Sequence, residues 1–109
     1  MSDKTLRVAE DFTPFPFGRY RSEGEYSGEA FRDDILWPLL SKGQSVEVNL
    51  DDVEGGLGSS FLEEVFGGII RKYGYTPARL KAQVTISSDE DPELVERTWE
   101  YVERAYTSQ

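Results

Sequence analysis

The sequence contains no cysteine and no histidine, and it lacks any long run of apolar residues. Without these two residue types there are no disulfides, no thiolate nucleophile and none of the usual zinc ligands. Histidine is also the commonest general base near neutral pH, so we expect a non-enzymatic protein without metal or cofactor. No segment approaches the ~20 apolar residues of a membrane span, and the polar start MSDKTLRV does not resemble a signal peptide. We therefore expect a cytoplasmic protein.

Positive charge is also scarce. Lys and Arg number 12 against 21 Asp and Glu, a formal net charge of -9. Such a surface repels a phosphate backbone and anionic lipids, so we expect neither nucleic acid nor a membrane as partner. The 109 residues are 38% hydrophobic and 13% aromatic, which is enough to build the core of one small domain over residues 1–109.

Periodicity predicts alternating strands and helices. Apolar residues at every second position indicate strands at 5–9, 46–50 and 79–87. Rows at three-to-four spacing indicate helices that start after Ser27, Ser60 and Asp91, of which the first carries Pro38 and should be bent or shortened by it. Because the strands alternate, each has one polar face, and we expect an α/β fold with a mixed β-sheet and helices packed mainly on one face.

The stretch from Gly56 to Glu64, GLGSSFLEE, joins a predicted strand to a predicted helix. Ser60 followed by Glu63 fits a capping box, in which the serine hydroxyl closes the helix start. Ser59 has no such role and should be exposed at the turn. A phosphate on Ser59 would meet unpaired backbone N–H groups and the positive end of the helix dipole.

Nearby carboxylates would repel that phosphate unless arginines lie close to it. Arg19, Arg21 and Arg32 are the candidates for such an anion-binding patch, although pairing with surface carboxylates is the commoner role of such arginines. The aromatic series Phe12, Phe15 and Phe17 is consistent either with packing or with a docking surface.

Other chemistry at the turn has less support. The glycine-rich loop lacks the lysine and spacing of a P-loop, so a nucleotide site is a weaker alternative. A hydrolytic serine has no neighbouring histidine to activate it. The cluster of Asp51, Asp52 and Glu54 lacks calcium-loop spacing and is expected to be a solvated strand end.

Three ordered motifs carry a family resemblance. They are Gly18-Arg19-Tyr20, then Ser27-Gly28-Glu29 with Phe31-Arg32, then Ser59-Ser60-Phe61-Leu62-Glu63-Glu64 with Phe66-Gly67-Gly68. Together, over about 12–73, they resemble the prokaryotic STAS-like domain family of unassigned function, which is related to the anti-sigma factor antagonists. In those antagonists an acidic residue usually precedes the paired serines and a glycine follows them, whereas this chain has Gly58 and Phe61.

The resemblance implies partner switching. In the antagonists a serine at the turn between strand and helix is phosphorylated by a histidine-kinase-like ATPase partner, and Ser59 is the matching position, with Ser60 as its neighbour. We expect a regulatory protein-interaction module of unknown oligomeric state. An alternative is a small acidic inhibitor or decoy, from a phage or defence setting, that binds a basic protein surface. The predicted partner-binding residues are Gly56, Leu57, Gly58, Ser59, Phe61, Glu63 and Glu64.

Overall fold

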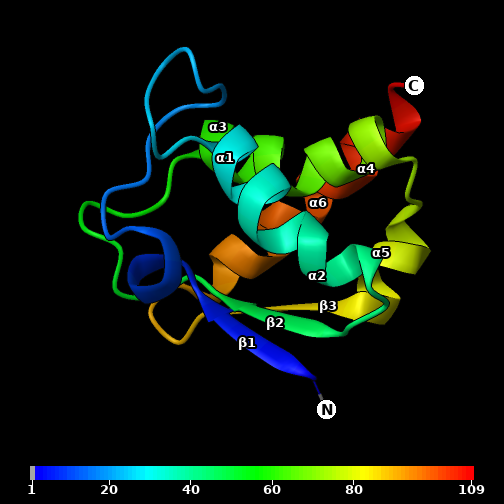
Figure 1. Ribbon diagram of the computed structural model, residues 1–109, viewed down its shortest axis with the longest axis horizontal. Coiled ribbons are helices and arrows are strands. Elements are labelled where there is room, and N and C mark those ends of the chain that lie inside the picture. The colour runs from blue at the N-terminus through cyan, green and yellow to red at the C-terminus, as the bar shows by residue number, and fades with distance from the viewer. Residues whose placement is uncertain (1) are drawn as a thin grey trace.

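The computed structural model describes residues 2–109 as a small parallel sheet covered by helices (Figure 1). The strands are β1 (Lys4–Arg7), β2 (Val46–Asn49) and β3 (Val84–Ser87), in the order β1-β2-β3. Both strand pairs are parallel, with Leu6 opposite Val48 and Val48 opposite Ile86. The predicted α/β class is confirmed, but the sheet is parallel rather than mixed, because helices cross between successive strands and return the chain in the same direction.

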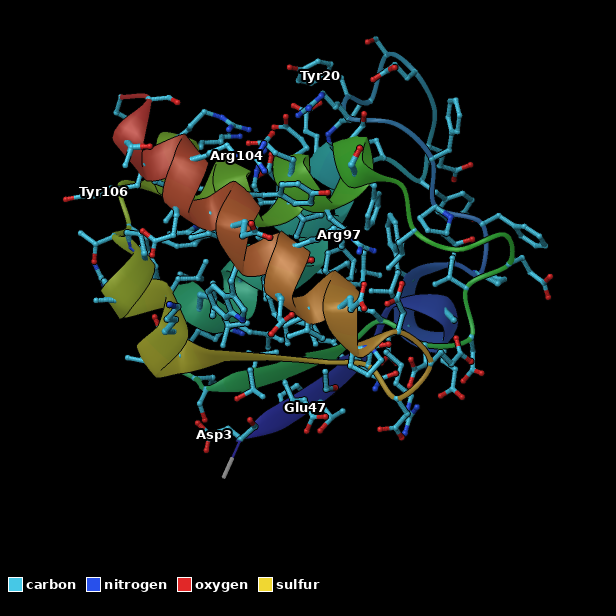
Figure 2. All side chains as sticks on the ribbon, turned by 180° about the vertical axis from the view of Figure 1, so that it is seen from behind. Asp3, Tyr20, Glu47, Arg97, Arg104 and Tyr106 are labelled. Atoms are coloured by element: carbon cyan, nitrogen blue, oxygen red, sulfur yellow. The ribbon has the colours of Figure 1, made fainter. Side chains whose placement is uncertain are left out.

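The two faces of the sheet differ in chemistry, as the alternating sequence predicts. Leu6, Val48 and Ile86 are buried beneath the helices. Glu47 projects to the opposite side, away from every helix (Figure 2), where Ser87 donates a hydrogen bond of 2.8 Å to it. The expectation that helices pack mainly on one face is therefore confirmed.

The first strand is shorter than predicted. It ends at Arg7, and residues Val8–Phe12 form a π-helical turn, η1, closed by a hydrogen bond from the Thr13 N–H to the Val8 carbonyl. The Asp11 carboxylate accepts a hydrogen bond of 2.7 Å from the Arg7 N–H. That contact ties the π-helical turn to the last residue of the strand.

The first long helix runs through α1 (Gly28–Ala30), a π-helical segment η2 (Phe31–Leu36) and α2 (Trp37–Ser41). Its start is as predicted, because Ser27 accepts a hydrogen bond from the Ala30 N–H. Pro38 does not end this helix. The helix accommodates the proline through a wider, π-helical turn just before it. In that turn the Trp37 N–H donates to the Arg32 carbonyl, five residues earlier.

The second long helix comprises α3 (Ser59–Leu62), the π-helical segment η3 (Glu63–Gly67) and α4 (Gly68–Tyr73). Gly74, at a φ of 71°, ends it in the left-handed conformation that favours glycine. The last helix, α6 (Pro92–Thr107), starts at Asp91 as predicted, with the Asp91 side chain accepting from the Leu94 N–H. It packs across the second long helix.

The predicted strand over 79–87 is half wrong. Its first part belongs to helix α5 (Pro77–Gln83), and only Val84–Ser87 is a strand. Thr76 caps this helix by accepting from the Arg79 N–H, and Pro77 occupies its first turn, where a missing N–H costs nothing. Because of this cap, the segment forms a helix even though Leu80 and Ala82 alternate as in a strand. Leu80 is still buried, but it lies on a helix.

One hydrophobic core joins the sheet to both long helices. An aromatic group at one end of it fixes the chain next to the predicted turn: the rings of Phe12 and Phe31 lie 5.2 Å apart, and those of Phe31 and Phe61 lie 6.1 Å apart. Phe12 is thus a packing residue. Its ring also contacts Tyr26 at 5.5 Å, which holds the far end of the 14–26 loop against the core.

Candidate functional site

The turn after β2 leads directly into the second long helix. Gly55 and Gly56 have φ angles of 72° and 79°, a region that other residues adopt only with strain. The Gly58 carbonyl accepts the first helical hydrogen bond, from the Leu62 N–H at 3.2 Å. The backbone N–H groups of residues 59–61 therefore lie in the open first turn.

Ser60 does not cap this helix, contrary to the predicted capping box. Gly58 is the residue at the cap position, and no side chain there bonds to the first turn. The helix starts earlier than the sequence indicated, so Ser60 lies inside the first turn, and Glu63 is paired with arginines rather than with the Ser60 N–H. Ser59 and Ser60 are both exposed at the helix start.

An open cavity of about 640 Å³ lies beside the two serines. One side is the glycine-rich turn and the other is the 14–26 loop, and the Glu54 N–H donates a 2.8 Å hydrogen bond to the Pro14 carbonyl between them. The two segments lie next to each other in Figure 1 as well. The lining residues are Pro16, Phe17, Gly18, Arg19, Tyr20, Glu23, Gly55, Gly56, Gly58, Ser59, Ser60 and Phe61.

The 14–26 loop presents aromatic side chains to solvent. Phe15 and Phe17 are 66% and 68% exposed, and Tyr20 is 49% exposed. Exposed aromatics gathered in one short segment, rather than scattered, are a feature of interaction surfaces. For the aromatic series left open above, the structure places Phe12 in the packing and Phe15 and Phe17 on the surface.

The loop itself is well anchored. The Gly28 N–H donates to the Gly18 carbonyl at 3.0 Å, and the Glu29 N–H donates to the Arg19 carbonyl at 2.8 Å. The Glu23 carboxylate accepts from the backbone N–H groups of Arg19 and Tyr20 at 2.9 and 3.0 Å, and these bonds lower the pKa of Glu23. The wall of the cavity is therefore built into the start of the first long helix.

Arg19 projects from this loop to the second long helix. Its Nη1 lies 2.5 Å from Oε1 of Glu63 and 3.5 Å from Oε1 of Glu64. Glu63 has a second partner in Arg71, whose Nη1 lies 2.5 Å from Oε2. Burial opposes the ionisation of Glu63, but hydrogen bonds from Arg71 and Arg19 outweigh it and lower the pKa.

Arg32 is not part of the surface around Ser59. Its side chain is only 4% exposed, with Nη1 2.5 Å from Oε2 of Glu64 and Nε 2.8 Å from Oδ1 of Asp33. The predicted anion-binding role is thus wrong for Arg32, because all three nitrogens of its guanidinium donate hydrogen bonds to Asp33 or Glu64. Arg21, the third candidate, forms a bidentate pair of hydrogen bonds with exposed Asp34.

The predicted partner-binding residues separate into two groups. Gly56, Gly58 and Ser59 are exposed and line the cavity. Leu57 is half-buried against the core, and Phe61 is 2% exposed within it. Glu63 and Glu64 are engaged by arginines, so the helix start offers fewer free side chains than the sequence suggested. Tyr20 and Glu23 were missed, and Phe17 was considered only as part of the aromatic series, because only the folded chain brings the loop to the turn.

In the acidic cluster after β2, Asp52 and Glu54 are exposed, as predicted, whereas Asp51 has a structural role. Asp51 is 8% exposed, so the solvated strand end predicted for it is wrong. Its carboxylate accepts from the Ser88 hydroxyl at 2.7 Å and from the Asp89 N–H at 3.0 Å, which ties the end of β2 to the turn after β3. Within residues 2–109, no grouping of three or more acidic side chains is arranged to hold a metal ion.

The parallel three-stranded sheet with helices on one face, and a cavity where β2 leads into its helix, define a small α/β domain. A family model described as a STAS-like domain of unknown function (DUF4325) matches residues 27–93. The chain belongs to this family. Comparisons with curated proteins and with solved structures gave no significant match. Among residues 2–109, no helix has the length and apolar character needed to cross a membrane.

Proposed function

We propose that this STAS-like domain is a non-enzymatic regulatory module that binds a partner protein at the cavity beside Ser59. The observation that carries the proposal is the position of the Ser59 hydroxyl. It is exposed at the first turn of a long helix, on the rim of a cavity whose other wall carries exposed Phe17 and Tyr20. Aromatic anchors around a recess are typical of the centres of protein interfaces.

The 14–26 loop lies before the matched region 27–93. Half of the residues that line the cavity therefore lie before the matched range. We propose that this loop sets which partner is bound, while the glycine-rich turn supplies the serine. Gly55, Gly56 and Gly58 leave open space around their backbone, which allows another chain to approach Ser59 closely.

Phosphorylation of Ser59 is the proposed switch. The partner would be a histidine-kinase-like ATPase, in which the Ser59 oxygen forms a bond to the terminal phosphorus of ATP as the bridge to ADP breaks. ADP leaves, and the hydroxyl proton passes to a base of the kinase. The new charge lies at the open end of the helix dipole, where an anion is stabilised, and it alters the surface that the partner contacts.

Intact-mass measurement after co-expression with such an ATPase tests the switch. We expect the mass of one phosphate on the wild-type chain and on Ser60→Ala, and none on Ser59→Ala. Phosphate found only at other residues, or none at all, would end the switching proposal. Docking is tested separately: Phe17→Ala and Tyr20→Ala should weaken binding of the ATPase, whereas Tyr106→Ala should not, since this exposed tyrosine on α6 does not line the cavity.

A second candidate function, the acidic inhibitor or decoy, draws support from α6. Four glutamates at three-to-four spacing are exposed along this helix: Glu93, Glu96, Glu100 and Glu103. Such a row suits a basic protein surface. Salt separates the candidates, because binding through α6 should weaken steeply as ionic strength rises and should be lost when these glutamates become glutamine, whereas binding through Phe17 should depend little on salt.

A further inference from the structure

Glu63 holds two arginines where one would neutralise it. Arg71, eight residues later on the same helix, contacts both carboxylate oxygens of Glu63, at 2.5 and 3.1 Å. Arg19 contacts Oε1 from the 14–26 loop at 2.5 Å. If Arg19 left, Glu63 would keep its bond to Arg71, so the departure would leave no half-buried carboxylate unpaired.

Ser59 lies within the reach of Arg19. It precedes Glu63 by four residues, and side chains at this spacing on a helix are neighbours, ~5–6 Å apart at Cβ. Arg19 and Ser59 also line the same cavity. The Arg19 side chain is 35% exposed, so it has room to turn from Glu63 toward the cavity. Its backbone stays in place, because the Arg19 N–H is bonded to Glu23 and the Arg19 carbonyl to the Glu29 N–H.

We propose that Arg19 is the residue that receives a phosphate on Ser59: the guanidinium exchanges Glu63 for the phosphate, and Arg71 retains Glu63. This inference rests on the proposed function, because it concerns the regulation of the same serine. A doubly charged phosphate competes well with a carboxylate for a guanidinium, since it offers more charge and the same two-fold hydrogen-bond geometry.

The exchange explains how a phosphate can be accommodated at an acidic site. Glu23 lines the cavity and Glu54 lies in the adjoining turn, so without a cation the new charge would be repelled. With Arg19 turned inward, phosphate and guanidinium occupy the space between Phe17 and the glycine-rich turn. The recess that the partner used is then filled, which couples modification to release.

The test uses the full chain with phosphoserine inserted at position 59 during translation, so that no kinase is needed. Phosphorus NMR follows the second ionisation of the phosphate, which has an ordinary pKa of about 6. We expect Arg19→Gln to raise this pKa by about one unit relative to the otherwise wild-type phosphorylated chain, because a bound guanidinium favours the dianion. Arg21→Gln is the matched control: it removes the same charge two residues away, from an arginine paired with Asp34, and should leave the pKa unchanged.

A second measurement needs no variant. The guanidinium NMR signal of Arg19 should move when Ser59 is phosphorylated, while that of Arg71 stays near its original position. Equal phosphate pKa values in the wild-type and Arg19→Gln chains, or an unmoved Arg19 signal, would overturn the exchange. Either result would leave the proposed function standing, since a kinase can still modify Ser59. Conversely, absence of modification by the ATPase would end the proposed switch, while the phosphate pKa and the Arg19 signal would still test the exchange.

Discussion

Arg32 and Glu64 form a buried ion pair between the two long helices, with Nη1 of Arg32 2.5 Å from Oε2 of Glu64 and side chains only 4% and 8% exposed. The same Nη1 also donates to the Glu64 carbonyl at 3.2 Å. Gly68 makes room for this arrangement, because a Cβ there would collide with the Arg32 side chain. The pair thus fixes how the helices cross, and it removes both side chains from the surface near Ser59.

Breaking this pair should be costly. Arg32→Ala leaves Glu64 with only its longer contacts to Arg19 and Arg71. Glu64→Ala leaves Arg32 with Asp33 as its remaining carboxylate partner. We therefore expect each to lower the free energy of unfolding by about 1–3 kcal/mol. Denaturant unfolding measures the loss. Arg21→Ala, which removes an exposed partner of Asp34, is the control and should have a much smaller effect. Similar losses in both cases would argue against a structural role for the buried pair.

Gly28 should not tolerate a side chain. A Cβ at this position would lie 2.8 Å from the Phe61 carbonyl oxygen and 3.0 Å from Cβ of Glu64, so the two long helices would have to separate. We expect Gly28→Ala to lower the melting temperature and to cost about 1–3 kcal/mol, despite the better helix propensity of alanine. Gly24→Ala, where a Cβ meets nothing within 4 Å, should be close to neutral.

The serines at helix starts should differ in their contribution to stability. Ser27 is fully buried and accepts from the Ala30 N–H at 3.2 Å, so Ser27→Ala should cost about 1 kcal/mol or more. Ser59 and Ser60 make no capping bond, and alanine at either should change the free energy of unfolding by less than about 0.5 kcal/mol. A large loss for Ser60→Ala would restore the capping role that its spacing to Glu63 predicts.

Asp33 should make the free energy of unfolding depend on pH in the acid range. Burial opposes its ionisation, but hydrogen bonds from Arg32, Lys72 and Tyr73 prevail and hold the pKa of Asp33 well below its usual range. A carboxyl whose pKa is lower in the folded chain contributes stability above its unfolded pKa, about 3.9, and loses it as pH falls toward the folded value. The free energy of unfolding should therefore drop below about pH 4. Asp33→Asn should show a shallower decline, and parallel curves for the two proteins would contradict this assignment.

Local patterns predicted much of the architecture. Alternation located β2 and β3, the latter as the end of a longer predicted strand. Three-to-four spacing located both long helices, and Ser27 and Asp91 marked helix starts that the structure confirms. These features depend on neighbours within one or two turns, which is the range that a sequence pattern encodes. The error over residues 79–87 is also local. Thr76 and Pro77 are a helix-start signal in the sequence, but the alternation that follows them favoured a strand.

The site was less accessible to such patterns. The sequence by itself determined the residues at the turn, the charge balance and the polar face of each strand. Only the tertiary structure decided that Arg32 pairs with Glu64, 32 residues away, and Arg19 with Glu63, 44 residues away. The strength of an ion pair depends on distance and burial, and both are set by how the helices and the 14–26 loop pack, not by spacing along the chain.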